Sequence, residues 1–193
     1  IQPNRTQDAP LAIGVIFTTT ETPKYTYVEP EEYEQLRGYL ANGSRLVVQG
    51  PSGSGKSSIV TKALAELKQT AKWILCSDDA QLAELVALLT QPIHERLVID
   101  EAHLLEPEVL RPLASRIYNQ QPDGQITAIG LGDVRGALLD HIDARLREPL
   151  ARRLMGVVLS SRRDLGSQAR LEKLVSLGEA VAKIQFTQAR ELI

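Results

Sequence analysis

The sequence predicts an α/β protein whose core is a five-stranded, mostly parallel sheet sandwiched by helices. Two observations favour this fold class. Short apolar runs, continuous rather than alternating, are separated by amphipathic helical patterns along most of the chain. A strand is apolar on both sides when helices cover both faces of its sheet, which is the usual state of parallel strands. With 193 residues, of which 43 % are hydrophobic, the chain can bury one full core.

The first part of the chain differs from the rest. Residues 1–21 begin polar and proline-containing and turn apolar and β-branched over 11–20, which is compatible with a strand. We interpret residues 1–21 as a linker or as the edge of a preceding domain. An extended arm at 22–28 then leads into a helix that begins near Pro30, has an acidic first turn and ends at Asn42.

The elements that follow alternate regularly. Strands are predicted at 45–49, 72–76, 96–99, 125–130 and 156–160. Helices are predicted at 59–68, about 79–91, 107–118, 137–154 with a break at Pro149, and 167–183. In the helix that follows the second strand, an apolar stripe of Leu82, Leu85, Val86 and Leu89 is predicted to face the core.

A glycine-rich loop joins the first of these strands to the helix at 59–68. It fits the pattern G-x-x-x-x-G-K-[ST], which cradles phosphates. Its glycines let successive N–H groups point at phosphate oxygens, and the following helix adds the positive end of its dipole. Lys56 can reach the β- and γ-phosphates, and the Ser57 hydroxyl suits Mg²⁺. The predicted nucleotide-binding residues are Gly50, Pro51, Ser52, Gly53, Ser54, Gly55, Lys56, Ser57 and Ser58.

Two acids end the buried strand at 96–99. Ligands bind beyond the carboxyl ends of strands in open α/β sheets, so a carboxylate at Asp100 is placed to help Ser57 hold Mg²⁺. Glu101 could orient the attacking water or accept its proton. The plainer interpretation of both acids is helix capping, and the phosphate loop upstream argues against it.

Together with Ala102 and His103, these acids spell D-E-A-H, as in DEAH-box helicases. The interval after Lys56 leaves room for only one further strand and helix, which argues against a helicase.

Taken in this order, the motifs resemble those of the AAA+ superfamily and of its signalling relatives, the STAND ATPases. The resemblance runs from about Thr22 to the end of the chain and implies a P-loop NTPase fold of AAA+ type. It implies an ATPase core at 22–165 and the start of a small helical lid at 166–193. It also implies that Tyr27 and Val28, in the arm before the first helix, contact adenine, with packing as the equal alternative.

The same resemblance implies two further catalytic residues. Asp133 follows the strand at 125–130, where the family carries its sensor 1 residue; Asn or Thr is more usual there, and Asp133 could equally cap the next helix. Arg153, beside Arg152, matches the arginine finger that reaches a neighbouring subunit's γ-phosphate. A solvated or salt-bridged arginine is the alternative. Arg162 and Arg163 could make a hinge contact with nucleotide.

The composition limits the partners and the cellular compartment that we expect. The formal net charge of −2 shows no overall basic footprint for nucleic acid, although arginines are dense in the second half and suggest a solvated surface, a subunit interface or a phosphate-contacting stripe. Cys76 is the single cysteine, which fits a reducing, cytoplasmic setting. No apolar run approaches a membrane span, so no membrane partner is expected. The chain starts at Ile1 rather than Met, as a piece of a longer protein would.

The sequence thus predicts an ATP- and Mg²⁺-dependent ATPase switch module of a larger AAA+/STAND-type protein. Its expected partners are ATP and ADP, further copies of itself in a homo-oligomer, or other domains of the same polypeptide. Two alternatives stay open. One is a DNA-handling AAA+ ATPase of the replication-loader or transposition-helper type. The other is a nucleotide-dependent scaffold with negligible turnover.

Overall fold

The computed structural model describes residues 29–120, 124–159, 172–173 and 175–177. The chain divides into two compact units, residues 30–161 and residues 1–29 together with 162–193. Nearly all described residues lie in the first unit, which we call the core. The expected strand at 11–20, the arm at 22–28 and most of the expected lid lie outside the described residues.

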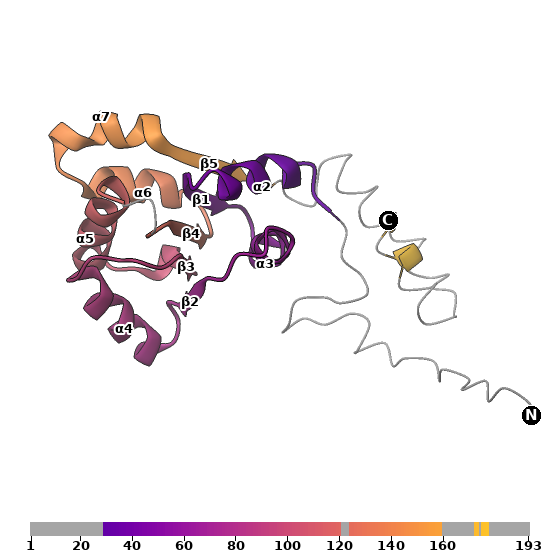
Figure 1. The fold of residues 1–193 in the computed structure, drawn as a ribbon, viewed down its shortest axis with the longest axis horizontal. Coiled ribbons are helices and arrows are strands. Elements are labelled where there is room, and N and C mark those ends of the chain that lie inside the picture. Colours follow the sequence, from indigo (N-terminus) through magenta and orange to yellow (C-terminus); the bar gives the residue numbers. More distant parts are fainter. Residues whose placement is uncertain (1–28, 121–123, 160–171, 174, 178–193) are drawn as a thin grey trace, which may run out of the picture. The chain divides into compact units, whose positions relative to one another are not determined.

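In the core, helices and strands alternate as the sequence predicts (Figure 1). The strands are β1 (Arg45–Gln49), β2 (Lys72–Leu75), β3 (Leu97–Asp100), β4 (Ile126–Gly130) and β5 (Leu154–Val158). The helices are α2 (Tyr33–Ala41), α3 (Lys56–Glu66), α4 (Asp79–Leu89), α5 (Pro107–Tyr118), α6 (Val134–His141) and α7 (Ala144–Arg153), with a 3₁₀ turn, η1 (Ala102–Leu104), after β3.

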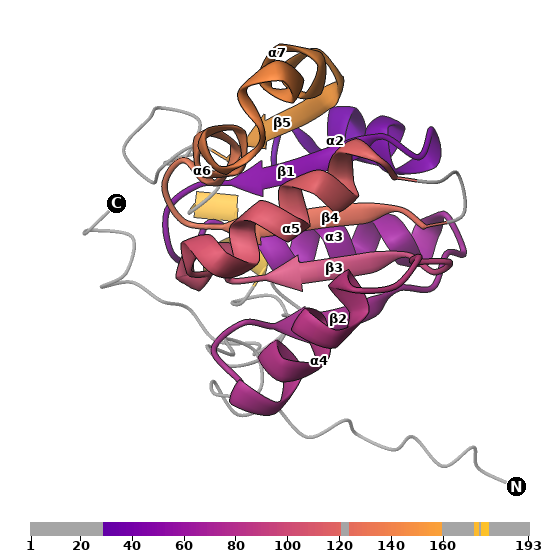
Figure 2. The same ribbon diagram turned by 90° about the vertical axis from the view of Figure 1, so that its left-hand side faces the viewer.

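The five strands form one sheet in the order β2-β3-β4-β1-β5, and every neighbouring pair is parallel (Figure 2). The predicted fold class is therefore confirmed, with a sheet that is wholly rather than mostly parallel. Because all strands point the same way, the sheet has one carboxyl edge and one amino edge. The loops after the strands gather at the carboxyl edge, and the carboxyl ends of the helices that precede strands gather at the amino edge.

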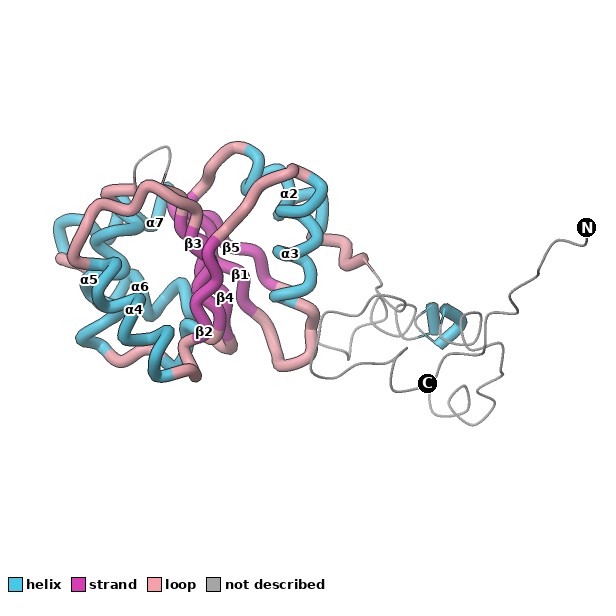
Figure 3. Tube along the Cα trace, turned by 60° about the horizontal axis from the view of Figure 1, so that its bottom comes forward, coloured by secondary structure: helices cyan, strands magenta, loops and turns pink. Residues whose placement is uncertain are grey.

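Helices cover both faces of the sheet, which explains why its strands are continuously apolar (Figure 3). On one face, α2 and α3 pack over a cluster that includes Leu46, Val48 and Ile129. On the other, α4 to α7 pack over a larger cluster that includes Val47 and Ile99. Alternate residues of β1 thus enter opposite clusters, as the period of a strand requires.

Three local expectations need correction. The break between the last two core helices falls at Asp143, whose carboxylate accepts from the Arg145 N–H (2.8 Å) and starts α7, while Pro149 lies inside that helix. Val86 is 46 % exposed rather than buried. The helix after the phosphate loop starts at Lys56 rather than Ile59, since the loop itself forms its first turn.

No helix among the described residues is long and apolar enough to cross a membrane.

Candidate nucleotide site at the carboxyl edge

The loop between β1 and α3 depends on glycine at two positions. Gly50 has φ 154°, and a Cβ there would lie 2.7 Å from the carbonyl oxygen of Leu159, so the loop starts in direct contact with the chain that leaves β5. Gly55 has φ 87° and is the N-cap of α3. Both conformations are ones that L side chains rarely adopt. The loop thus delivers the amino end of α3, with its free N–H groups, to the carboxyl edge.

Lys56 is the first residue of α3 and turns back over the loop. Its ammonium donates hydrogen bonds to the carbonyl oxygens of Gly50 (3.1 Å) and Pro51 (2.8 Å). Partial burial lowers the pKa of Lys56 below its ordinary value, and the negative charge of Asp100 partly offsets this. A cation held close to the loop's amides is suited to a polyphosphate, whose oxygens would bind both.

The next residue connects the loop to β3. The Ser57 hydroxyl donates a 2.5 Å hydrogen bond to Oδ2 of Asp100, so the two predicted metal ligands are in contact across the sheet. The other oxygen of Asp100 accepts from the Glu101 N–H at 2.8 Å, which fixes the carboxylate. Helix α3 and strand β3, far apart in sequence, therefore place a hydroxyl and a carboxylate at one point.

These two groups fit Mg²⁺, which prefers oxygen ligands and usually keeps ligand positions for water and phosphate. The described residues contain no group of three or more His, Cys, Asp or Glu that could hold a metal by itself. A metal held by Ser57 and Asp100 would therefore need further ligands such as water or a phosphate oxygen.

Glu101 has an unusual backbone. Its φ of 57° and ψ of 33° lie in the left-handed region, which costs a non-glycine residue about 1–2 kcal/mol. One carboxylate oxygen, Oε2, is buried and has no hydrogen-bond partner among the described residues. Backbone strain and an unsatisfied carboxylate at the same residue are typical of a functional site.

Cys76, the residue that follows β2, is buried next to the strand that carries Asp100. Its N–H donates to the Asp100 carbonyl at 3.1 Å. Burial, with the nearby charges of Asp100 and Glu101, raises the pKa of the Cys76 thiol to about 12. The thiol is therefore protonated and unreactive at neutral pH.

Asp133 follows β4 at the same edge. Its carboxylate accepts the Gly136 N–H at 2.8 Å and caps α6, so the capping role allowed by the sequence is present. His103, in η1, packs against the end of β4: a Cβ at Gly130 would lie 3.0 Å from its backbone nitrogen and 3.3 Å from its Nδ1. A sensor role for Asp133 stays a prediction.

Arg153 lies at the amino edge, away from the phosphate loop. It precedes Leu154, which pairs with Arg45 at the start of β1, whereas the loop follows the other end of β1. Its guanidinium lies 5.7 Å from the centre of the Tyr118 ring. The structure does not bring Arg153 to the loop of its own chain, so a finger role requires a second subunit and stays a prediction. Arg152 is exposed and pairs with Glu148.

The remaining predicted contacts divide into four residues outside the described part of the chain and two serines in and after the loop. Tyr27, Val28, Arg162 and Arg163 lie outside the described residues. Ser54, in the loop, is 9 % exposed, and its hydroxyl has no partner among the described residues. Ser58 lies in the first turn of α3.

The sequence analysis did not predict that several arginines cap helices. At the carboxyl end of five helices, an arginine side chain donates a hydrogen bond to one of the last carbonyl groups, where the helix dipole is negative. These contacts are Arg96 on α2, Arg116 on α4, Arg45 on α5, Arg147 on α6 and Arg135 on α7. All five lie outside the helix that they cap, so no local sequence pattern predicts them. Of the arginines that make the second half dense, Arg135 and Arg147 therefore have a structural role.

No protein-family model matches the chain, and no curated protein does. Among solved structures, the chain is similar to RuvB of Thermotoga maritima, described as a Holliday junction branch migration motor. The TM-score is 0.52 and the identity 20 %, over 81 % of this chain and 52 % of that one. Two mutants of the same protein match at TM-scores of 0.52 (18 % identity, 81 % and 53 % covered) and 0.50 (20 % identity, 78 % and 48 % covered).

The chain spans about half the length of these structures. Identities near 20 % establish a shared fold rather than a shared activity. Together with the strand order β2-β3-β4-β1-β5 and the loop between β1 and α3, the TM-score of 0.52 shows that the core shares the α/β fold of RuvB.

Proposed function

We propose that this chain is the ATP-hydrolysing switch module of a larger AAA+/STAND-type protein. One observation carries the proposal: the phosphate loop and the acids after β3 converge, so that the Ser57 hydroxyl touches Asp100 beside the strained Glu101. A loop that only bound phosphate would not need a second acid there.

Each residue has a distinct role. The loop amides and Lys56 bind the phosphates of ATP, and Ser57 and Asp100 hold Mg²⁺, which would neutralise charge on the β- and γ-phosphates. Glu101 orients the attacking water and accepts its proton. Asp133, at the end of the neighbouring strand β4, senses the γ-phosphate through a water, because a carboxylate in direct contact with phosphate would be repelled.

The switch involves parts beyond the site. In this proposal residues 22–165 form the ATPase core, residues 166–193 begin a lid, and the arm with Tyr27 and Val28 holds adenine. The γ-phosphate biases the lid and the assembly of subunits, with Arg153 of one subunit serving the loop of the next. The single, buried Cys76 suits a reducing compartment such as the cytoplasm.

A second candidate function is a DNA-handling motor. It is favoured by the similarity of the core to RuvB, whose description names branch migration of Holliday junctions. The use of many arginines as helix caps, together with a net charge of −2, argues against a large basic surface on this chain. A scaffold that binds ATP without turning it over is the third candidate.

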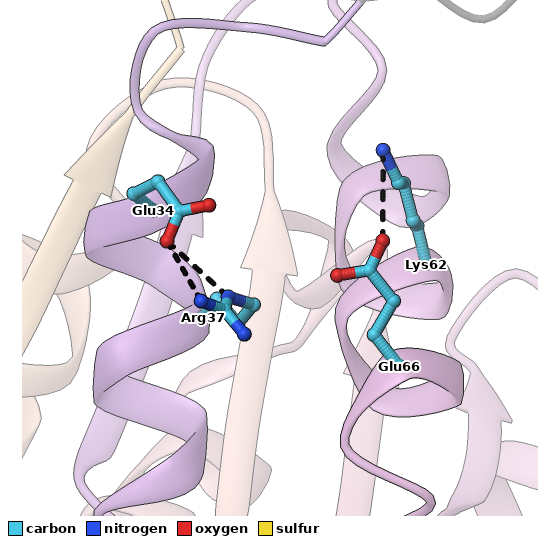
Figure 4. A network of polar contacts seen from close by, with 4 residues as sticks. All are labelled: Glu34, Arg37, Lys62 and Glu66. Atoms are coloured by element: carbon cyan, nitrogen blue, oxygen red, sulfur yellow. Dashed lines mark hydrogen bonds and ion pairs between the residues drawn. The ribbon is translucent and has the colours of Figure 1, made fainter.

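ATP binding and hydrolysis, measured with and without duplex DNA, separate the three. We expect Lys56→Ala to weaken ATP binding at least about tenfold, and Glu101→Gln to keep binding while losing turnover. Lys62→Ala is the matched control: Lys62 lies on the same helix and pairs with Glu66 at 3.7 Å (Figure 4). Unchanged binding in Lys56→Ala would refute the proposal. DNA-stimulated turnover with a steep salt dependence would favour the motor, and binding without turnover the scaffold.

A further inference from the structure

A cavity of about 580 Å³ opens at the amino edge of the sheet, at the opposite ends of the strands from the phosphate loop. We call it the amino-edge cavity. It is lined by residues 68–72, which follow α3 and enter β2, by residues 94–96, which enter β3, and by Gln125 before β4. Backbone hydrogen bonds from Lys72 N–H to the Arg96 carbonyl (2.9 Å) and from Leu97 N–H to the Gln125 carbonyl (2.8 Å) hold these segments together.

Arg96 is one of the residues that line this cavity. It is only 8 % exposed, and its Nη2 donates to the Leu40 carbonyl at the end of α2 (3.1 Å). Its other terminal nitrogen, Nη1, is buried without a hydrogen-bond partner among the described residues. Arg45, which caps α5 in the same manner, instead donates to three carbonyls. Arg96 therefore retains donor capacity that a purely capping arginine would use.

No described carboxylate neutralises Arg96. Burial lowers the pKa of its guanidinium, and no ion pair relieves that cost. A buried cation without a counter-ion is unfavourable and is compensated when an anion binds beside it.

The remaining charges around the cavity are mostly positive. The charged lining residues are Lys68, Lys72, Glu95 and Arg96, with His94 beside them. The Nζ of Lys72 forms an ion pair with Oε1 of Glu84 at 2.6 Å. Lys68 is exposed, has φ 53° at the end of α3, and has no acidic partner among the described residues. By contrast, Arg37, on the surface of α2, is paired with Glu34 of its own helix (Figure 4).

Gln69 adds a hydrogen-bond acceptor to the donors of Arg96 and Lys68. Its side-chain oxygen Oε1 is buried and has no donor among the described residues. Two residues that line the cavity thus hold an unsatisfied donor, on Arg96, and an unsatisfied acceptor, on Gln69, both buried beneath its surface. An anion without a hydrogen could satisfy only the donors, whereas one that carries a hydroxyl satisfies both.

We propose that the amino-edge cavity binds inorganic phosphate as the hydrogen-phosphate ion, with Arg96 and Lys68 binding its oxygens and Gln69 accepting its P–OH. Sulfate has the same shape and charge but no hydrogen at neutral pH. Nucleic-acid phosphodiesters also lack this hydrogen, so the site distinguishes free phosphate from both. Because Nη1 and Oε1 are buried, binding requires exposed side chains at the mouth, such as Lys68, to move aside.

Calorimetric titration with phosphate and with sulfate at pH 7.5 and constant ionic strength tests this site. Lys56→Ala serves as the parent, since the phosphate loop also binds anions. We expect phosphate to bind the parent about three- to tenfold more tightly than sulfate, which corresponds to one hydrogen bond. In that background Gln69→Met should remove the preference, and Lys68→Ala should weaken both anions.

Arg37→Ala in the same background removes an equal charge that does not line the cavity, and should leave both affinities unchanged. Arg96→Lys is a further variant, but Lys68→Ala and Gln69→Met do not disturb the cap on α2 and decide the question by themselves. Equal affinity for phosphate and sulfate in the parent, or no binding of either, would overturn the proposal. So would phosphate binding that survives both variants. None of these results bears on ATP binding by the wild-type loop.

Discussion

The two edges of the sheet are built from similar helices but have opposite characters. At the carboxyl edge, backbone with positive φ recurs at Gly50, Gly53, Gly55, Glu101 and Gly132, whereas the amino edge has Gly43 and Lys68. Polar atoms there lack partners among the described residues, including the Ser54 hydroxyl and Oε2 of Glu101. At the amino edge, arginines satisfy the carbonyl ends of the helices that lead into strands. The carboxyl edge keeps polar groups available for a ligand. The amino edge uses its arginines mainly for stability, and there the amino-edge cavity alone, with Nη1 of Arg96 and Oε1 of Gln69, holds the unpartnered groups described above.

The comparison predicts that substitutions at the two edges change different quantities. The largest effect is expected for Glu101→Gln. Turnover should fall at least about a hundredfold, because the amide cannot accept a proton. The free energy of unfolding should change by less than about 0.5 kcal/mol, since the size of the side chain is retained. Steady-state ATPase assays and urea denaturation on the same samples measure both. A loss of stability that matches the loss of turnover would contradict the comparison.

At the amino edge we expect the reverse for Arg45→Ala. Three carbonyls at the end of α5 lose their donor, so the free energy of unfolding should fall by about 2–3 kcal/mol. ATP affinity per folded molecule should not change. Arg152→Ala is the control, because its pair with Glu148 is exposed and should contribute less than about 0.5 kcal/mol. Denaturation curves with nucleotide titration test this, and an equal loss in both variants would show that capping is not the cause.

Asp133 could serve both stability, as the cap of α6, and nucleotide sensing, and two substitutions separate these roles. Asp133→Ala removes the cap on α6 and should cost about 1 kcal/mol of stability. Asp133→Asn keeps a capping oxygen and should be nearly as stable as the parent. If Asp133 also senses nucleotide, turnover should fall in Asp133→Asn despite normal stability. Unchanged turnover in this variant would leave capping as its only role.

Glu101→Gly examines the backbone strain alone. Glycine adopts a φ of 57° without penalty, so the folded state should gain up to about 1 kcal/mol, while turnover is lost with the side chain. Thermal unfolding should then show a higher midpoint for an inactive variant. A lower midpoint would mean that the carboxylate contributes more to stability than the strained backbone removes.

The smallest effect concerns Cys76. Because its pKa is raised to about 12 in the folded protein, the unfolded chain loses the thiol proton first as pH rises above its ordinary value near 9. Stability should therefore fall with rising pH above about 9, and Cys76→Ala should reduce that fall. Iodoacetamide labelling at pH 8 should be slow in the native protein and fast in urea. Rapid labelling of the native state would contradict the burial of this thiol.

The sequence predicted those parts of the molecule that depend on local patterns. The continuous apolar strands gave the parallel sheet, and the glycine spacing with Lys56 gave the loop that starts α3. Asp100 could be placed because parallel strands share a carboxyl edge. The amino edge could not be predicted, since Arg45 and Arg96 bind carbonyls that are distant in sequence. The break was predicted at Pro149, whereas the structure places it at Asp143, which caps the start of α7.

The contact between Gly50 and Leu159 has a mechanical consequence. The phosphate loop begins where the Leu159 carbonyl faces Gly50, and the Leu159 N–H donates to the Gln49 carbonyl at 2.8 Å. The first residue of the loop and the last residues of β5 are thus braced against each other by backbone alone, without a side chain that could yield. A displacement of Leu159 would therefore reach the first residue of the phosphate loop directly through backbone contacts. Even an alanine at Gly50 would force the two segments apart, because its Cβ would lie 2.7 Å from the Leu159 carbonyl oxygen.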